Sequence, residues 1–295
     1  MKSPNGAMKQ HSGVVHLPSG GALDFSGPAL IMAIVNCNED SFYAPSRALK
    51  EKAVEKALAA EKEGAAIIDF GGESSSPGSS YISEEEELAR LIPVINAFRK
   101  VSSLPVSVDT RKAIVARSAL DAGADIINDI SGLEDDPEMA AVCAERGAAV
   151  VLMHKKGIPL TMQDSPRYEN LALELHSWFR SAVERAEAAG IAGEKIFLDP
   201  GIGFGKNLAD NLEIIRRVDY YARLAETNRK HYPVVVGLSR KSFIGEITGR
   251  PPEERLSGTL AANGAAILGG VEIIRVHDVK EHKDLAEVLF ALRSE

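Results

Sequence analysis

The chain has 295 residues, 45% of them hydrophobic and 26% charged, with a formal net charge of −8 at pH 7. This composition is typical of a globular protein with a sizeable core, and the length allows one large α/β domain or two smaller ones. Nucleic-acid binding is disfavoured, because the chain has no block of clustered Lys and Arg to contact phosphates. If the protein binds an anion, the positive charge must come from a few Lys or Arg side chains at the binding site.

The cysteine content and the N-terminus both point to a cytoplasmic protein. Cys37 and Cys143 form no Cys-x-x-Cys pair, so neither a disulfide framework nor a zinc site is expected. Residues 1–20 carry no apolar run of signal-peptide length. No stretch approaches the roughly 18 apolar residues that span a bilayer. We therefore expect a cytoplasmic location and no membrane partner.

The first predicted element is a β-hairpin. Two short apolar runs within residues 14–25 flank the sequence Pro18-Ser-Gly-Gly, which is typical of a turn between strands. We assign residues 1–28 to an N-terminal segment with this hairpin. Residues 29–295 form a single larger domain, in which we find no linker.

Beyond this segment, eight short apolar runs alternate with helical stretches rich in Lys, Glu, Ala and Leu. Such largely continuous runs are expected for strands that are buried on both faces of a parallel sheet. Eight strands alternating with helices predict an α/β fold of the (β/α)8 TIM-barrel class. A Rossmann sheet is disfavoured, because no Gly-x-Gly-x-x-Gly follows the first run. The runs are residues 30–35, 66–70, 106–108, 125–127, 149–153, 195–198, 234–238 and 271–276.

Helix boundaries carry local signals. Four glycines each precede a buried run and are expected to end a helix in the left-handed conformation: Gly64, Gly123, Gly147 and Gly270. Ser83 with Glu86, and Asp278 with Glu281, predict capping boxes at helix starts. Asp136 before Pro137 predicts an N-cap followed by proline in the first helical position.

Every predicted strand ends in a polar side chain, and in a TIM barrel the active site lies at these carboxyl ends. Any one of them could be a capping residue of a strand-to-helix turn, but eight of eight converging on one rim predict a functional site. They are Asn36, Asp69 with Glu73, Asp109, Asn128, His154, Asp199, Ser239 with Arg240 and Lys241, and Arg275 with His277.

Asp109, Asn128 and Asp199 each follow a strongly apolar strand, so they are partly buried and need partners. Together they could hydrogen-bond the ring nitrogens and amino group of a flat heterocycle. Metal ligation is less attractive, because no histidine joins them at ligand-like spacing. A third possibility is that they only brace the rim of the barrel.

Three further segments are candidates for ligand contact. The turn Asp199-Pro-Gly-Ile-Gly-Phe-Gly-Lys lacks the glycine and Ser/Thr positions of a phosphate loop, so its glycines more plausibly admit a ligand beside Phe204. Arg275 and His277 lie two residues apart on the last strand, so both side chains point to the same side and place two potential cations there, which suits phosphate binding. The alternative is a salt bridge to the acidic helix that follows. Arg240, Lys241 and Ser242 lie at the neighbouring strand end, or form a solvated basic turn. His154 is expected to lie at the rim with its hydrogen bonds made inside the protein, and not to act in catalysis.

Eight motifs in chain order resemble those of the dihydropteroate synthase family, and together they span residues 31–278. Several motifs in the right order are a specific signal, although no single one is. They are Ile34-Val-Asn-Cys-Asn-Glu-Asp-Ser-Phe, Asp69-Phe-Gly-Gly-Glu-Ser-Ser-Ser-Pro-Gly, Val106-Ser-Val-Asp-Thr, Ile126-Ile-Asn-Asp-Ile-Ser-Gly, Leu152-Met-His, Leu198-Asp-Pro-Gly-Ile-Gly-Phe-Gly-Lys, Gly237-Leu-Ser-Arg-Lys-Ser-Phe and Arg275-Val-His.

The resemblance implies a TIM-barrel transferase of folate biosynthesis. Such an enzyme joins 4-aminobenzoate to 6-hydroxymethyl-7,8-dihydropterin pyrophosphate, giving 7,8-dihydropteroate and pyrophosphate with help from Mg2+. It further implies a homodimer that is inhibited by sulfonamides, which mimic aminobenzoate.

The resemblance also implies roles for individual residues. The pterin would be held by Asp109, Asn128, Asp199 and Lys241. The pyrophosphate would be held by Asn36, Arg275 and His277, with Asn36 at the metal. The aminobenzoate site would be lined by Phe204, Lys241, Ser242, Ser75 and Pro77. Catalysis, mostly positioning and electrostatics, would rest on Lys241, Arg275 and His277.

The sequence departs from the family pattern in two loops. Asn38 and Glu39 stand where the family usually has Thr and Pro, and an acidic residue often found after the Phe is absent at Ala44 and Pro45. Ser76 stands where an Arg is expected, which is not a conservative change. Because these loops close over the arylamine in the family, the departures predict an altered arylamine half beside an intact pterin half.

Two other interpretations stay open. The chain could be a pterin-binding barrel of another activity, such as a methyltetrahydrofolate-dependent methyltransferase, although such enzymes are not expected to show Ser-Arg-Lys-Ser and Arg-x-His together. It could also be a non-catalytic pterin-binding paralogue, an interpretation that the altered loops motivate.

Overall fold

The computed structural model describes residues 13–37, 46–74, 79–158, 160–218, 220–221 and 231–293. Eight parallel strands form one sheet in the order β8-β7-β6-β5-β4-β3-β10-β9. A parallel bridge between Leu198 and Val234 joins its two edges, so the predicted TIM barrel is confirmed. The strands are β3 (Leu30–Asn36), β4 (Ile67–Gly71), β5 (Val106–Asp109), β6 (Ile126–Asp129), β7 (Ala149–Met153), β8 (Ile196–Asp199), β9 (Val235–Val236) and β10 (Ile273–Val276).

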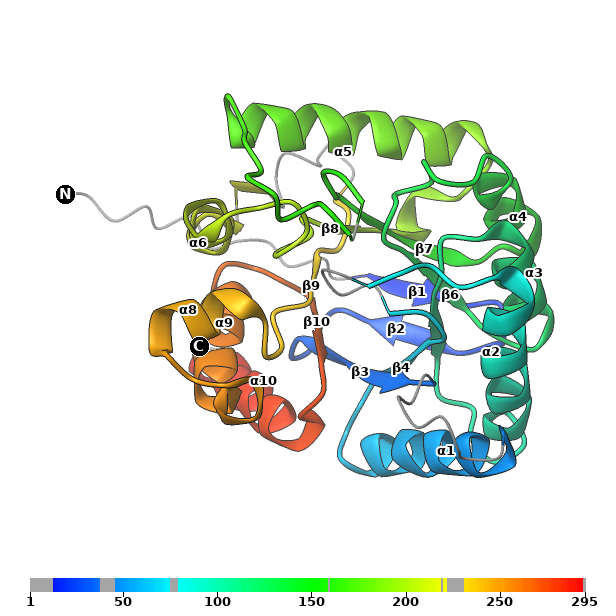
Figure 1. The fold of residues 1–295 in the computed structure, drawn as a ribbon. Helices are drawn as coiled ribbons and strands as arrows, with labels where there is room; N and C mark the ends of the chain where they lie inside the picture. The colour runs from blue at the N-terminus through cyan, green and yellow to red at the C-terminus, as the bar shows by residue number, and fades with distance from the viewer. Residues whose placement is uncertain are drawn as a thin grey trace.

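Helices surround the strands, as Figure 1 shows. They bury apolar side chains against the outer face of the sheet, while a second apolar cluster, which includes Met32, Ile126 and Phe197, lies on the hairpin side of the strands. Two short 3-10 helices, Gly193–Lys195 and Pro252–Glu254, lie between them. The α-helices are α1 (Ser46–Lys62), α2 (Glu84–Phe98), α3 (Ala113–Asp121), α4 (Met139–Arg146), α5 (Leu171–Ala188), α6 (Leu208–Arg216), α8 (Ser242–Thr248), α9 (Leu256–Leu268) and α10 (Val279–Arg293).

The N-terminal hairpin covers one end of the barrel. β1 (Val14–His16) and β2 (Ala22–Asp24) pair antiparallel, as the turn sequence predicts. Phe25 packs edge-on against Phe197 with ring centroids 6.0 Å apart, in a cluster with the first residues of the strands, such as Ile67 and Ile273. Ser19 N donates to Asp125 Oδ1 at 3.0 Å and anchors the turn. The hairpin thus closes the amino ends of the strands and leaves the carboxyl ends free.

The helix-end signals are partly confirmed. The four glycines adopt positive φ values of 100°, 103°, 61° and 98° in chain order, and Ser83 Oγ accepts from Glu86 N at 3.2 Å. Asp136 caps the turn that leads into α4, because its Oδ1 accepts from Glu138 N at 3.0 Å and its backbone O accepts from Met139 N, although α4 itself begins at Met139. The cap predicted at Asp278 is wrong. The Asp278 carboxylate binds Arg240 instead of capping α10.

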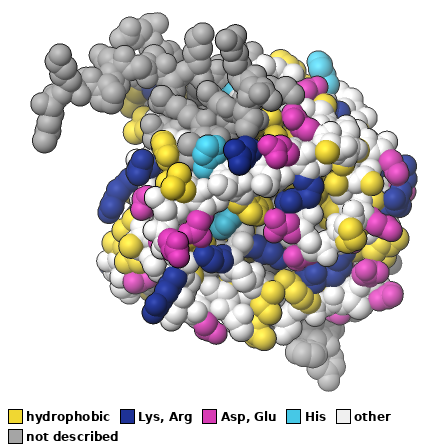
Figure 2. Space-filling view, turned by 90° about the horizontal axis from the view of Figure 1, so that it is seen from above, with side chains coloured by type: hydrophobic (Ala, Val, Ile, Leu, Met, Phe, Trp, Pro, Cys, Tyr) yellow, Lys and Arg dark blue, Asp and Glu magenta, His cyan; other side chains and the backbone are white. Residues whose placement is uncertain are grey.

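Charged side chains of both signs lie on the surface, and the two cysteines are buried. Over the described part of the face in Figure 2, Lys and Arg side chains are interspersed with Asp and Glu side chains. Cys37 and Cys143 are buried free thiols, and burial raises the pKa of each to about 12. None of the described helices combines the length and apolar character needed to cross a membrane.

Candidate functional site

The carboxyl ends of the strands surround a cavity of about 550 Å³. Seven residues predicted from the sequence line it, although they come from three different strand ends: Phe204, Ser239, Arg240, Lys241, Ser242, Arg275 and His277. Ile34, Gly203, Gly237 and Pro252 complete the wall. The cavity therefore combines the cations Arg240, Lys241 and Arg275 with an aromatic face.

Arg275 reaches from β10 across the barrel to two carboxylates. Its Nε donates to Asp69 Oδ2 at 2.6 Å and its Nη2 to Asp109 Oδ2 at 2.9 Å. Asn128 Nδ2 also donates to Asp69 Oδ2, at 3.5 Å. The salt bridge to the acidic helix after β10, considered as an alternative for Arg275, is wrong. Arg240 makes that bridge, to Asp278.

The pKa values of Asp109 and Arg275 follow from their burial and from the charges beside them. Desolvation raises the pKa of Asp109, the Arg275 guanidinium opposes that rise, and Asp69 adds to it. Desolvation disfavours the charged form of Arg275, but Asp69 and Asp109 outweigh this and raise its pKa. Arg275 thus stays cationic at the base of the cavity.

Asp69 is a member of this group that the sequence-based roles did not include. It is fully buried in the middle of the β4 run, and its Oδ1 has no hydrogen-bond partner among the described residues. The available signal was a carboxylate within an otherwise apolar strand, which requires a partner. That partner comes from Arg275, more than two hundred residues along the chain.

Lys241 and Phe204 lie together in the cavity wall, and Asp199 lies near enough to attract Lys241. The Lys241 ammonium lies 4.7 Å from the centroid of the Phe204 ring and donates to Ile202 O. Burial lowers the pKa of Lys241 to about 8, against the attraction of Asp199. Burial raises the pKa of Asp199, opposed by Lys241. Asp199 Oδ1 accepts from Gly201 N at 2.7 Å, so its other oxygen is the one available to a ligand.

His277 lies at the mouth of the cavity. Its Nδ1 is 2.9 Å from Ser239 Oγ, and its backbone N donates to the same oxygen at 3.3 Å. Desolvation at the cavity wall and the charge of Arg275 lower the pKa of His277, so its ring is neutral at pH 7. Without a bound anion His277 is therefore not a cation, and Lys241 joins Arg275 in supplying positive charge. The role of His277 at the pyrophosphate stays a prediction.

Asn36 and Asn128 end β3 and β6. Asn36 is exposed, and a Cβ added to Gly71 would lie 3.8 Å from Asn36 Oδ1 and 3.9 Å from Asp109 Cβ, so the amide oxygen faces the same space as Asp109. Asn128 is buried, as predicted. Among the described residues, no group of three His, Cys, Asp or Glu could hold a metal ion. An amide oxygen is nevertheless a suitable ligand for a Mg2+ that is held mainly by water and substrate phosphates.

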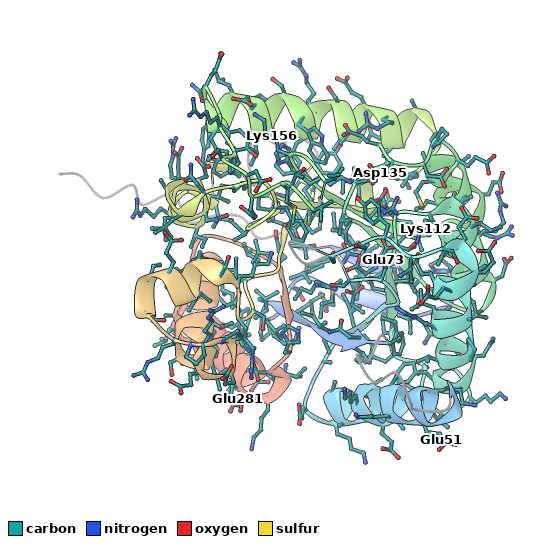
Figure 3. The ribbon with its side chains drawn as sticks, in the orientation of Figure 1. Glu51, Glu73, Lys112, Asp135, Lys156 and Glu281 are labelled. Atoms are coloured by element: carbon teal, nitrogen blue, oxygen red, sulfur yellow. The ribbon has the colours of Figure 1, made fainter. Side chains whose placement is uncertain are left out.

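A charged network lies on the rim beside the cavity. Glu73 Oε2 accepts from Lys112 Nζ at 2.9 Å and from Ile82 N at 2.7 Å, and Lys112 also donates to Glu87 at 2.5 Å. Figure 3 shows Glu73 and Lys112 pointing toward each other. The network ties residue 73 to residue 82. Asn38, Glu39, Ala44, Pro45, Ser75, Ser76 and Pro77 lie outside the described residues.

Known proteins match this chain over almost its whole length. The family described as pterin binding enzyme matches residues 32–277. The chain is 43% identical over 279 residues to the dihydropteroate synthase of Synechocystis sp., covering 94% of both chains. Its fold is similar to the Yersinia pestis dihydropteroate synthase in a sulfonamide drug complex, with a TM-score of 0.88, 38% identity and coverage of 96% of this chain and 100% of that one.

A second solved structure agrees with the first. The dihydropteroate synthase of Xanthomonas albilineans, determined with 4-aminobenzoic acid, has a TM-score of 0.86 and 38% identity, and the match covers 96% of this chain and 100% of that one. These matches agree with the cavity that Arg275, Lys241 and Phe204 line. The chain therefore belongs to the dihydropteroate synthase family.

Proposed function

We propose that this protein condenses 6-hydroxymethyl-7,8-dihydropterin pyrophosphate with 4-aminobenzoate to give 7,8-dihydropteroate and pyrophosphate. The observation that carries this proposal is the cavity itself. Arg275 is bonded there to the buried carboxylate of Asp109, and Lys241 lies over the ring of Phe204. The similarity to dihydropteroate synthases, one of them determined with 4-aminobenzoic acid, supports it.

The pterin end of the substrate matches the buried layer. The carboxylate and amide groups of Asp109, Asn128 and Asp199 can accept hydrogen bonds from the amino and ring N–H groups of a pterin. Because these side chains are buried, a ligand that leaves them without hydrogen-bond partners would bind less well. The Lys241 ammonium can move from Ile202 O to a ring acceptor. A pterin in this layer places its methylene toward Arg275.

Bond cleavage develops negative charge on the leaving pyrophosphate. The C–O bond at the pterin methylene breaks with its electron pair on oxygen, and the arylamine nitrogen forms the new C–N bond and then releases one proton. Arg275, fixed by two carboxylates, needs no reorganisation to stabilise that charge. His277 would contribute a hydrogen bond from a neutral ring. The pterin ring delocalises charge on the methylene, so no protein nucleophile is needed.

We include Mg2+ in the proposal, with Asn36 as its protein ligand. When bound, the ion would neutralise pyrophosphate charge. Asn36 Oδ1 faces the space beside Asp109, where the phosphates of a pterin held by that carboxylate would lie.

The arylamine would occupy the outer part of the cavity, between Phe204 and Ser242. The ring of Phe204 offers a stacking face, and the Lys241 ammonium beside it attracts a carboxylate. Ser75 and Pro77 are proposed to complete this half. A sulfonamide, as in the Yersinia pestis complex, would bind in the same place.

The decisive experiment measures pyrophosphate release from the pterin pyrophosphate with Mg2+, in the presence and absence of 4-aminobenzoate. Release that depends on 4-aminobenzoate, with formation of dihydropteroate, is expected. Pterin binding without such release would refute the synthase activity and favour a non-catalytic paralogue. The methyltransferase alternative is set aside, because relatives at 43% identity carry the synthase name.

Homodimerisation stays a prediction. α9 exposes Leu268, and α10 exposes Val288 and Leu292, so these helices present apolar side chains at the surface. A molar mass measured by light scattering during gel filtration tests it: twice the chain mass is expected, and a monomer at micromolar concentration would contradict it.

A further inference from the structure

The glycine-rich turn between β8 and α6 is held by an unusual set of hydrogen bonds. Four consecutive carbonyl oxygens in this turn, those of residues 202 to 205, each accept from a different side chain. The donors, in order, are Lys241, Gln163, Lys206 at 3.2 Å and the Tyr168 hydroxyl at 2.8 Å. Two residues of the turn line the cavity, Gly203 and Phe204, and Phe204 contributes the side chain. The donors thus fix the backbone that carries this ring.

Among these donors, Lys206 is the one buried within the protein, with 2% of its surface exposed. Its ammonium lies 2.9 Å from His154 Nδ1 and donates to His154 O at 3.3 Å as well as to Phe204 O. Burial, and then the charge of Lys206, lower the pKa of His154 to about 2, so all three partners are neutral. Burial also lowers the pKa of Lys206 itself to about 7, an effect that the charges of Asp199 and Asp210 oppose. Protonated or neutral, its Nζ carries hydrogens to donate to both carbonyls, so the three contacts hold in either state.

The turn lies flat against the backbone that follows β7. A Cβ on Gly201 would come within 1.9 Å of His154 O, and one on Gly205 within 2.2 Å of Lys156 O. Both glycines have positive φ, of 66° and 64°, so other residues would be strained there. Lys156 is labelled in Figure 3 in this region, beneath α5. The Lys206 ammonium therefore fastens together two backbone segments that are already in contact.

Loss of this ammonium has a predictable consequence for the cavity. The carbonyls of Phe204 and His154 would both lose a donor, and buried carbonyls without partners are unfavourable. The Phe204 peptide would rotate or shift to reach water, and its ring would move with it. The pterin layer should respond less than the arylamine site, because Asp109 and Asn128 lie on β5 and β6, away from the turn. Asp199 does contact the turn, but through the backbone N–H of residue 201, not through the Phe204 peptide.

We propose that Lys206 is a positioning residue, whose ammonium locks the 201–205 turn onto the end of β7 and thereby holds the Phe204 ring as the wall of the arylamine site. This inference rests on the proposed function for its kinetic consequence. Lys206 itself contacts no substrate and acts through Phe204.

The test compares Lys206→Met with Lys195→Met. Lys195 is a control at the other end of β8, because its Nζ also donates to a turn carbonyl, Gly147 O at 2.6 Å, in a half-buried contact at the amino end of the strand, away from the cavity. In Lys206→Met we expect the KM for 4-aminobenzoate to rise about 10-fold while the Kd for the pterin pyrophosphate, measured by calorimetry, changes less than about 2-fold. In Lys195→Met we expect neither to change.

A readout without catalysis separates this inference from the proposed function. Hydrogen exchange of the amides of residues 203 and 204, which are bonded to Asn211 Oδ1 and Gly201 O, is expected to accelerate about 10-fold in Lys206→Met and not in Lys195→Met. If the wild-type protein releases no pyrophosphate, the synthase activity fails but this exchange still decides the role of Lys206. Unchanged exchange, or an unchanged arylamine KM in an active enzyme, would overturn the proposal.

Tyr168→Phe keeps the proposal testable if Lys206→Met does not fold. This variant removes only the hydroxyl that donates to the next carbonyl of the turn, Gly205 O. A smaller rise in arylamine KM with faster exchange in the same turn is expected. No change in either quantity would count against a positioning role for the turn contacts.

Discussion

Arg275 and Asp109 are joined across the mouth of the barrel by a hydrogen bond of 2.9 Å from Nη2 to Oδ2. The two residues lie on strands separated by β3 and β4 in the sheet order. The contact links the cation proposed to bind the pyrophosphate with a carboxylate proposed to bind the pterin. Substitution of either residue should therefore affect both halves of the pterin pyrophosphate.

Asp109→Asn should keep the barrel folded and weaken pterin binding by about 10- to 100-fold. The amide oxygen can still accept a hydrogen bond, but it lacks the negative charge that attracts Arg275 and the pterin N–H groups, and hydrogen bonds to charged groups contribute roughly 1.5–3 kcal/mol. Calorimetric titration with the pterin pyrophosphate measures the effect. Asp135→Asn is the control, because Asp135 forms its ion pairs on the rim. A normal affinity in Asp109→Asn would remove this residue from the site.

The pH dependence of activity should contain a falling limb near pH 8. Burial lowers the pKa of Lys241 to about 8, below the usual value, so its positive charge is present below pH 8 and is lost as the pH rises through it. Above that point, kcat/KM for the pterin pyrophosphate should fall about tenfold per pH unit. The profile of Lys241→Met should be lower and lack this limb. A wild-type profile that stays flat to pH 10 would contradict the prediction.

Chelation of divalent cations should abolish pyrophosphate release, and added Mg2+ should restore it. In Asn36→Ala, the Mg2+ concentration for half-maximal rate should rise about 10-fold, because one oxygen ligand is lost while the phosphates and water still hold the ion. A titration of the rate with Mg2+ in both proteins measures this. The same half-maximal concentration in both would exclude Asn36 as a ligand.

Lys112→Met should destabilise the protein by about 3–5 kcal/mol, because it leaves Glu87 and Glu73 without their shared cation in a buried setting. Arg117→Met is the matched control. Its ion pair with Glu145 is exposed, so its loss should cost less than about 1 kcal/mol. Urea unfolding followed by circular dichroism measures both. Equal effects would mean that the rim network contributes no more than a surface pair.

Ser76→Arg should change the inhibition constant of a sulfonamide. The family pattern has arginine at this position, and a guanidinium there would add a fixed positive charge next to the arylamine half. Inhibition of pyrophosphate release by one sulfonamide, compared between the two proteins, tests this. An unchanged constant would show that the residue at position 76 does not control the affinity.

The sequence alone determined the architecture and the set of candidate residues. Eight apolar runs with polar ends predict buried parallel strands, because a strand covered on both faces needs apolar side chains throughout, and the glycines before them predict where helices end. Helix starts were less predictable. Asp278 has the residue type of an N-cap, but the guanidinium of Arg240 competes for its carboxylate, and that competitor lies far away along the chain.

Only the tertiary structure decided how the site residues are partnered. The ion pairs of Arg275 with Asp69 and Asp109, and the contact of Lys206 with His154, join strands that are distant in sequence. The charge of a site residue is also decided by the tertiary structure. The sequence marks His277 as a potential cation, but desolvation and the neighbouring Arg275 lower its pKa in the folded protein. Residue type and spacing specify which groups reach the rim. Their pKa values and hydrogen bonds depend on burial and on neighbours, which exist only once the barrel has closed.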